Sequence, residues 1–242
     1  MTQSRGRVEV LGGAYGRTGV SREFAISSES PWRPWVERTA WTVVPPLVQG
    51  VGKLAWRLDV DLGNGLPDAP FVVASNHLSF LDGPLIGTVL RRKIRFLALV
   101  DLFGNYRWLD FALAAVDVIP LKRGVIPLGP MRAALGHLAR GGAVGLFPEG
   151  TRHPSFDPTR SRPGAAWLAI RAGVPLIPVA VTGTDKVLGV DNRLHTGRIR
   201  VAVGRPLHPV GSDRTAVEHL MERWCRWVSD QLAALDSRSR GH

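Results

Sequence analysis

The chain has 242 residues, 45% of them apolar, which is enough for one good hydrophobic core with short extensions. Its single cysteine, Cys225, excludes an intramolecular disulfide, and no Cys/His cluster has the spacing of metal ligands. The net charge of +11 indicates attraction to anionic surfaces or phosphorylated substrates, unless it only reflects an arginine-rich composition. Because the basic residues are scattered and no zinc-finger or RNP-like signature occurs, we expect no nucleic-acid partner.

The N-terminal part, residues 1–30, is rich in Gly, Ser and Arg and is predicted to be a flexible tail. Glycine and arginine interrupt every apolar stretch there, so we expect no secretory signal. No segment of the chain reaches the run of about 18 apolar residues that predicts a transmembrane helix.

Residues 31–60 combine tryptophan with basic side chains, and Pro45-Pro46 should divide them into two short helices. The aromatic and basic residues are Trp32, Trp35, Trp41, Trp56, Arg33, Arg38, Lys53 and Arg57. This mixture is typical of the lipid headgroup region and predicts a membrane-association segment. The alternative is that the tryptophans pack on the core of the protein itself.

Residues 61–236 alternate between strand-like and helix-like segments, which predicts one α/β domain. Strands are predicted at residues 71–74, 94–99, 116–121, 143–147, 174–181 and 199–203, and helices at 83–90, 131–140 and 164–172. We expect a central, mostly parallel or mixed sheet flanked by helices, with an N-terminal helical extension.

The last helix is predicted from one apolar stripe and from a capping box formed by Thr215 and Glu218. The stripe consists of Val217, Leu220, Met221, Trp224, Val228 and Leu232. Cys225 lies beside the stripe, which favours a structural thiol over a nucleophile.

A histidine and an aspartate lie five positions apart directly after the predicted strand at 71–74. An imidazole such as that of His77 can take a proton from a hydroxyl near neutral pH, and a carboxylate such as Asp82 can orient it. Asn76 and Ser79 can add hydrogen bonds that hold the loop. Taken alone, the pair could also be a structural histidine beside the aspartate of a helix N-terminus.

A second polar cluster, Glu149-Gly150-Thr151-Arg152, follows the predicted strand at 143–147, and Lys122-Arg123 follows the strand at 116–121. Arg152 can bind phosphate in a bidentate manner, and Glu149 can hold a substrate hydroxyl or fix a basic neighbour. Each basic pair alone is more often a solvated surface. Three clusters after three strands indicate one site at one edge of the sheet.

These motifs resemble the blocks of the glycerolipid acyltransferase family, particularly the 1-acylglycerol-3-phosphate acyltransferase type. The segment from Asn76 to Asp82 resembles its His-x-x-x-x-Asp block, and Phe147 to Arg152 matches its Phe-Pro-Glu-Gly-Thr-Arg block at every position. Residues 119–123 and 174–179 resemble two further blocks, and the order and spacing agree over roughly residues 60–210. The implied fold is glycerol-3-phosphate acyltransferase-like.

The resemblance implies that His77, oriented by Asp82, deprotonates the hydroxyl of a lysophospholipid, which attacks the thioester of acyl-CoA or acyl-carrier protein. It assigns the acceptor site to Arg123, Glu149, Gly150, Thr151, Arg152 and Arg162, with Arg162 also able to bind coenzyme A phosphates. Lys122, as a cation beside Arg123, is expected to bind substrate there too. No metal or cofactor is implied. Backbone amides near the His77 loop are expected to stabilise the oxyanion. The expected location is the cytoplasmic face of the cell membrane, bound peripherally to an anionic surface.

Three departures from the family pattern lie on the acceptor side: Leu99, Asp117 and Lys122. They leave open an acyltransferase that acts on a different lysolipid or hydroxylated lipid. A lipid-binding relative without catalysis is the remaining alternative, and the presence of His77, Asp82 and Glu149 together argues against it.

Overall fold

The domain is built on a seven-stranded sheet with the strand order β1-β7-β6-β2-β5-β3-β4. The computed structural model describes residues 50, 55–63, 65–68, 70–99, 118–121, 128–189 and 193–240. The strands are β1 (Asp59–Asp61), β2 (Phe71–Ser75), β3 (Ile94–Leu99), β4 (Ile119–Leu121), β5 (Ala143–Leu146), β6 (Leu176–Thr182) and β7 (Arg200–Val203).

The sheet is mixed, which confirms the predicted class. Five strands run parallel to one another in the order β6-β2-β5-β3-β4. Strand β7 is antiparallel to β6, and β1 is parallel to β7. Strands β6, β2 and β5 are central in the strand order, and their carboxyl ends therefore lie side by side.

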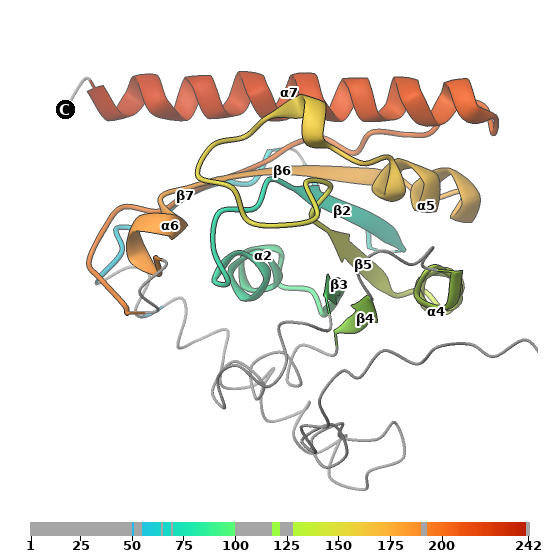
Figure 1. The fold of residues 1–242 in the computed structure, drawn as a ribbon, viewed down its shortest axis with the longest axis horizontal. Coiled ribbons are helices and arrows are strands. Elements are labelled where there is room, and N and C mark those ends of the chain that lie inside the picture. The colour runs from blue at the N-terminus through green and yellow to red at the C-terminus, as the bar shows by residue number, and fades with distance from the viewer. Residues whose placement is uncertain are drawn as a thin grey trace, which may run out of the picture.

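Helices cover both faces of the sheet (Figure 1). They are α2 (Asp82–Leu90), α4 (Leu128–Ala139), α5 (Gly164–Ala172), α6 (Thr184–Val187) and α7 (Arg214–Arg240), with a short 3-10 helix at Pro158–Arg160. Helices α4, α5 and α7 share one hydrophobic cluster, and α2 belongs to the cluster on the opposite face.

Strand β2 is buried on both faces because successive side chains of a strand point to opposite sides. Val72 and Ala74 pack in the cluster under α4, α5 and α7, whereas Phe71 and Val73 pack in the cluster under α2. This explains why residues 71–74 form a continuous apolar run.

The amino-terminal boundary of the domain lies earlier than the predicted residue 61. Trp56 is only 5% exposed and packs in the cluster under α2, and its carbonyl accepts a hydrogen bond of 2.9 Å from the amide of Ile199. Strand β1 then pairs with β7. The membrane interpretation is therefore wrong for Trp56, because the core buries its large apolar ring.

Residues 31–49 and 51–54 of the predicted N-terminal segment, including Trp32, Trp35 and Trp41, lie outside the described residues, as do the predicted tail and residues 116–117 of the third predicted strand. Among the described helices, none combines the length and the hydropathy needed to cross a membrane.

The start of α7 differs from its prediction. The side chain of Asp213 accepts a hydrogen bond of 2.8 Å from the amide of Ala216, so Asp213 caps the helix. Glu218 instead pairs with Arg214 at 2.8 Å, and the predicted capping box between Thr215 and Glu218 does not form. Asp213, which lies directly before the helix, supplies a better-placed acceptor than Thr215, which lies inside the helix.

Helix α7 is anchored to the strand that leads into the His77 loop. Trp224 is fully buried, and its indole Nε1 donates a hydrogen bond of 2.9 Å to the carbonyl of Ala74. Its ring also meets Phe156 edge-on, with 5.6 Å between the ring centroids. One side chain thus joins α7, β2 and the loop before α5.

We expect Trp224→Phe to lower the free energy of unfolding by about 1–3 kcal/mol, because it shrinks a buried ring and leaves a buried carbonyl without this donor. Urea denaturation measures the change. Trp167→Phe, at a position that is 39% exposed, is the matched control and should change stability little. Equal losses in the two variants would contradict the anchoring role.

Candidate active site

The candidate site lies where three adjacent strands end. Residues 76–81 follow β2, residues 147–153 follow β5, and Thr184 begins α6 just after β6. Because β2 pairs with both β5 and β6 in parallel register, these segments meet at one edge of the sheet. This confirms the predicted convergence of the first and second polar clusters.

His77 and Asp82 form a hydrogen-bonded pair, with 2.8 Å between Nδ1 and Oδ2. The His77 side chain is 14% exposed and Asp82 is fully buried. A carboxylate only accepts hydrogen bonds, so the network assigns the imidazole proton to Nδ1. Nε2 is left as the atom that can take a proton from a bound hydroxyl.

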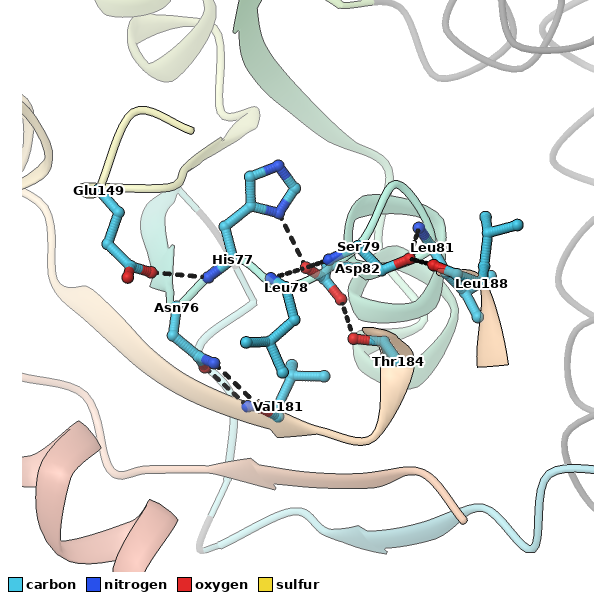
Figure 2. Close-up of polar contacts among 10 residues, drawn as sticks. All are labelled: Asn76, His77, Leu78, Ser79, Leu81, Asp82, Glu149, Val181, Thr184 and Leu188. Atoms are coloured by element: carbon cyan, nitrogen blue, oxygen red, sulfur yellow. Dashed lines mark hydrogen bonds and ion pairs between the residues drawn. The ribbon is translucent and has the colours of Figure 1, made fainter. Parts of the chain in front are cut away.

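Asp82 is held by donors from two segments (Figure 2). The amides of Leu78 and Ser79 donate to Oδ2 at 2.7 and 2.8 Å. The hydroxyl of Thr184 donates to Oδ1 at 2.5 Å. Together with the Nδ1–H of His77, four donors hold the carboxylate in the orientation that it needs to position the imidazole.

Asn76 and Ser79 support the loop, as predicted. The Asn76 amide donates to the carbonyl of Val181 at 2.9 Å and accepts from its N–H at 2.8 Å. The Ser79 hydroxyl donates to the carbonyl of Leu188 at 2.7 Å. Both side chains are buried, and their partners lie on β6 and just after α6.

Thr184 was not found from the sequence, although it contributes to the site as directly as Ser79. Its only signal is a hydroxyl close behind the apolar strand β6, in the run Val181-Thr182-Gly183-Thr184. Many strands end in such residues, so only the tertiary structure shows which hydroxyl reaches Asp82.

The segment 147–153 holds His77 from its other side. Glu149 Oε2 accepts a hydrogen bond of 2.8 Å from the amide of His77. The amide of His153 donates to the carbonyl of His77 at 2.9 Å. Glu149 is only 5% exposed, so we reassign it from the predicted acceptor-binding role to support of the His77 backbone.

Burial raises the pKa of Glu149 from 4.5 to about 7, while hydrogen bonds from the His77 and Asp157 backbone oppose the shift and the charges of Asp82 and Asp157 add to it. Its second oxygen, Oε1, is buried and has no hydrogen-bond partner among the described residues. A buried carboxylate with one unsatisfied oxygen favours the protonated form.

An aromatic stack lies against the imidazole. The rings of His77 and Phe147 are nearly parallel, with 3.9 Å between centroids and an angle of 13°. Phe96 lies 5.2 Å from Phe147 and supports it. A Cβ at Gly145 would come within 2.4 Å of Phe96, so only glycine leaves room for that ring. The stack and Asp82 together limit rotation of the imidazole.

The loop that carries Glu149 turns at Gly150, whose φ of +71° is unfavourable for residues with a side chain. Thr151 and Arg162 are exposed, and Arg152 is half-buried over the ring of Phe80. The amide of Arg162 donates to the carbonyl of Pro148 at 2.9 Å, which brings this residue beside the loop. Lys122 and Arg123 lie outside the described residues.

The amides of the His77 loop are already engaged. Those of His77, Leu78 and Ser79 donate to Glu149 and Asp82. They hold carboxylates and are excluded as donors to an oxyanion. The expectation that this loop supplies the oxyanion site is therefore wrong for these three amides.

A reactive cysteine and a metal centre are the two remaining kinds of site. Cys225 is half-buried, and burial raises the pKa of its thiol. This agrees with a structural thiol. Within the part of the chain that the structure describes, no three His, Cys, Asp or Glu side chains gather as metal ligands.

The chain is similar in sequence to known proteins. The family model named Acyltransferase matches residues 57–182. The chloroplastic 1-acyl-sn-glycerol-3-phosphate acyltransferase of Arabidopsis thaliana is 30% identical over 167 residues, covering 65% of this chain and 46% of that protein. This chain therefore spans about half the length of that relative. The 1-acyl-sn-glycerol-3-phosphate acyltransferase of Pseudomonas aeruginosa is 30% identical over 181 residues, covering 70% of this chain and 66% of that protein.

A solved structure has the same fold. The crystal structure of a 1-acyl-sn-glycerophosphate acyltransferase from Thermotoga maritima superimposes with a TM-score of 0.61 at 23% identity. The match covers 83% of this chain and 81% of that chain.

The raised pKa of Glu149 predicts a pH-dependent stability. In the native state Glu149 holds a proton that it releases near pH 4.5 in the unfolded chain. The free energy of unfolding therefore falls as the pH rises from 4.5 to about 7. We expect wild type to lose on the order of 3 kcal/mol relative to Glu149→Gln between pH 4.5 and about 8. Glutamine keeps an acceptor for the His77 amide but does not ionise.

Urea denaturation at several pH values measures the difference. Glu218→Gln, which removes a carboxylate from an exposed pair on α7, is the matched control and should follow wild type. A Glu149→Gln variant whose stability parallels wild type across this range would contradict the buried, protonated carboxyl group.

Proposed function

The chain belongs to the acyltransferase family, and we propose that it transfers an acyl group from an acyl thioester to the free hydroxyl of 1-acylglycerol-3-phosphate, giving phosphatidic acid. The observation that carries this proposal is the His77 imidazole, which is bound through Nδ1 to the buried Asp82 and keeps Nε2 available. The names of the Arabidopsis and Pseudomonas relatives support the choice of acceptor.

The proposed reaction needs no covalent acyl-enzyme. Nε2 of His77 takes the proton of the acceptor hydroxyl while its oxygen attacks the thioester carbonyl carbon. Asp82 stabilises the imidazolium through Nδ1. The tetrahedral intermediate then collapses as the carbon–sulfur bond breaks, and the imidazolium returns its proton to the departing thiolate. The products are the ester and the free thiol of coenzyme A or of acyl-carrier protein.

The acceptor phosphate needs cations near the base. Half-buried Arg152 lies between Glu149 and His153, which bind the backbone of His77, so its guanidinium suits this role. We assign Arg123 to the same phosphate on the family pattern and Lys122 to it as the neighbouring cation. We assign the exposed Arg162 either to that phosphate or to those of coenzyme A. Gly150 and Thr151 shape the turn between Glu149 and Arg152.

An acceptor screen with labelled acyl-CoA and acyl-carrier protein tests the proposal, with products identified by mass. We expect phosphatidic acid from 1-acylglycerol-3-phosphate, and a loss of about 10²- to 10⁴-fold in kcat for His77→Gln. His153→Gln is the matched control, since its side chain pairs with Arg160 and not with Asp82. Transfer only to another lysolipid would show that the proposed acceptor, 1-acylglycerol-3-phosphate, is wrong. Undiminished turnover by a folded His77→Gln would refute the base.

We also propose that the protein acts at an anionic membrane surface, since its acceptor is a lipid and its net charge is +11. Because Trp56 belongs to the core, the test substitutes only Trp32, Trp35 and Trp41 by alanine. We expect the triple variant to sediment several-fold less with vesicles of phosphatidylglycerol and phosphatidylethanolamine. Trp167→Ala, on exposed α5 surface, is the control. Unchanged sedimentation of the triple variant would contradict this role.

A further inference from the structure

Phe80 and Arg152 form a contact that none of the assigned roles explains. The Cζ atom of Arg152 lies 3.6 Å from the centroid of the Phe80 ring, a short cation–π distance. Phe80 belongs to the loop between His77 and Asp82, and Arg152 belongs to the segment 147–153. The contact therefore joins the base-bearing loop to the segment proposed to bind the acceptor phosphate.

The backbone segment that carries Arg152 is held against the backbone of His77. Glu149 and His153, which flank Arg152, bind the amide and the carbonyl of His77 at 2.8 and 2.9 Å. The Phe80 ring is partly buried and packs against the hydrophobic cluster under α2. Both ends of the contact thus rest on parts of the protein that are themselves held in place.

The guanidinium is prepared for an anion. It has no ion-pair partner among the residues that the structure describes, although Asp82 is close enough to act on it through its charge. Burial lowers the pKa of Arg152, and the charge of Asp82 opposes this. A partly desolvated cation without a carboxylate partner gains more from a bound phosphate than a solvated or paired one.

An aromatic ring is well suited to hold such a cation. A ring occupies the face of the planar guanidinium and leaves its N–H edges available for bidentate hydrogen bonds. A carboxylate in the same place would occupy those edges and neutralise the charge. Phe80 can therefore fix the orientation of Arg152 without competing with the ligand.

We propose that Phe80 is a positioning residue that orients Arg152, so that the two side chains together determine the preference for a phosphorylated acceptor. This inference rests on the proposed function and adds a residue to acceptor recognition. Phe80 has no proton to exchange and acts only through Arg152, so its removal should weaken binding of the phosphate and leave the chemical step unchanged.

Steady-state kinetics of Phe80→Leu and Phe80→Tyr tests the inference with two acceptors, 1-acylglycerol-3-phosphate and phosphate-free 1-acylglycerol. We expect Phe80→Leu to raise KM for the phosphorylated acceptor about 2- to 30-fold, the range of a cation–π contact, with kcat unchanged. KM for 1-acylglycerol should not change. Phe80→Tyr keeps the aromatic face and should restore the wild-type KM.

A double-mutant cycle shows whether Phe80 acts through Arg152. In an Arg152→Gln background, Phe80→Leu should have no further effect on KM. An equal loss with both acceptors, a loss mainly in kcat, or effects that simply add in the double variant would each overturn the inference. Thermal unfolding of each variant shows whether a change in KM comes from misfolding. If Phe80→Leu misfolds, Phe80→Tyr alone and in the Arg152→Gln background tests the inference instead.

Direct binding separates this inference from the proposed function. Calorimetric titration with monomeric 1-hexanoylglycerol-3-phosphate measures the coupling of Phe80 and Arg152 without any transfer. Coupled binding in a protein that transfers no acyl group would refute the proposed activity and support the recognition element. Transfer by wild type without coupling in the titration would refute the recognition element alone.

Discussion

The site depends on one buried carboxylate, that of Asp82. A charge that is fully removed from water costs several kcal/mol unless donors surround it. Here the donors are the imidazole of His77, two amides of the loop between them, and the hydroxyl of Thr184. Conformations of the loop that withdraw these donors leave the charge unsatisfied. The same requirement that orients the His77 ring therefore folds the loop that carries it.

A second constraint acts on the backbone of His77. Its amide and carbonyl are both bound by residues 147–153, and its ring stacks on Phe147 from that segment. The side chain is held in its plane by Asp82 and across its face by Phe147. Such restriction favours catalysis, because a base that already lies in its reactive orientation loses little entropy when the substrate arrives.

The sequence predicted the parts of the fold that follow local patterns. The strand Ile94–Leu99 lies where its apolar run predicts it. The helix Gly164–Ala172 lies where predicted because Pro163 precedes it and Gly173 ends it. The His77–Asp82 pair was identified through its spacing and its family block. Long-range contacts could not be predicted: nothing local shows that Trp56 enters the core or that Glu149 binds a backbone amide. Thr184 reaches Asp82 across 102 positions, which no periodicity reveals.

The fold also separates the proposed base from Leu99, a position that departs from the family pattern. The base and its supports come from the ends of β2, β5 and β6, the buried centre of the sheet, where a substitution disturbs several hydrogen bonds at once. Of the residues that depart from the family pattern, Leu99 ends β3, whereas Asp117 and Lys122 lie outside the described residues. Arg152 and Phe80 belong to the two loops that hold His77, so the cation–π contact between them joins the proposed phosphate site to those loops.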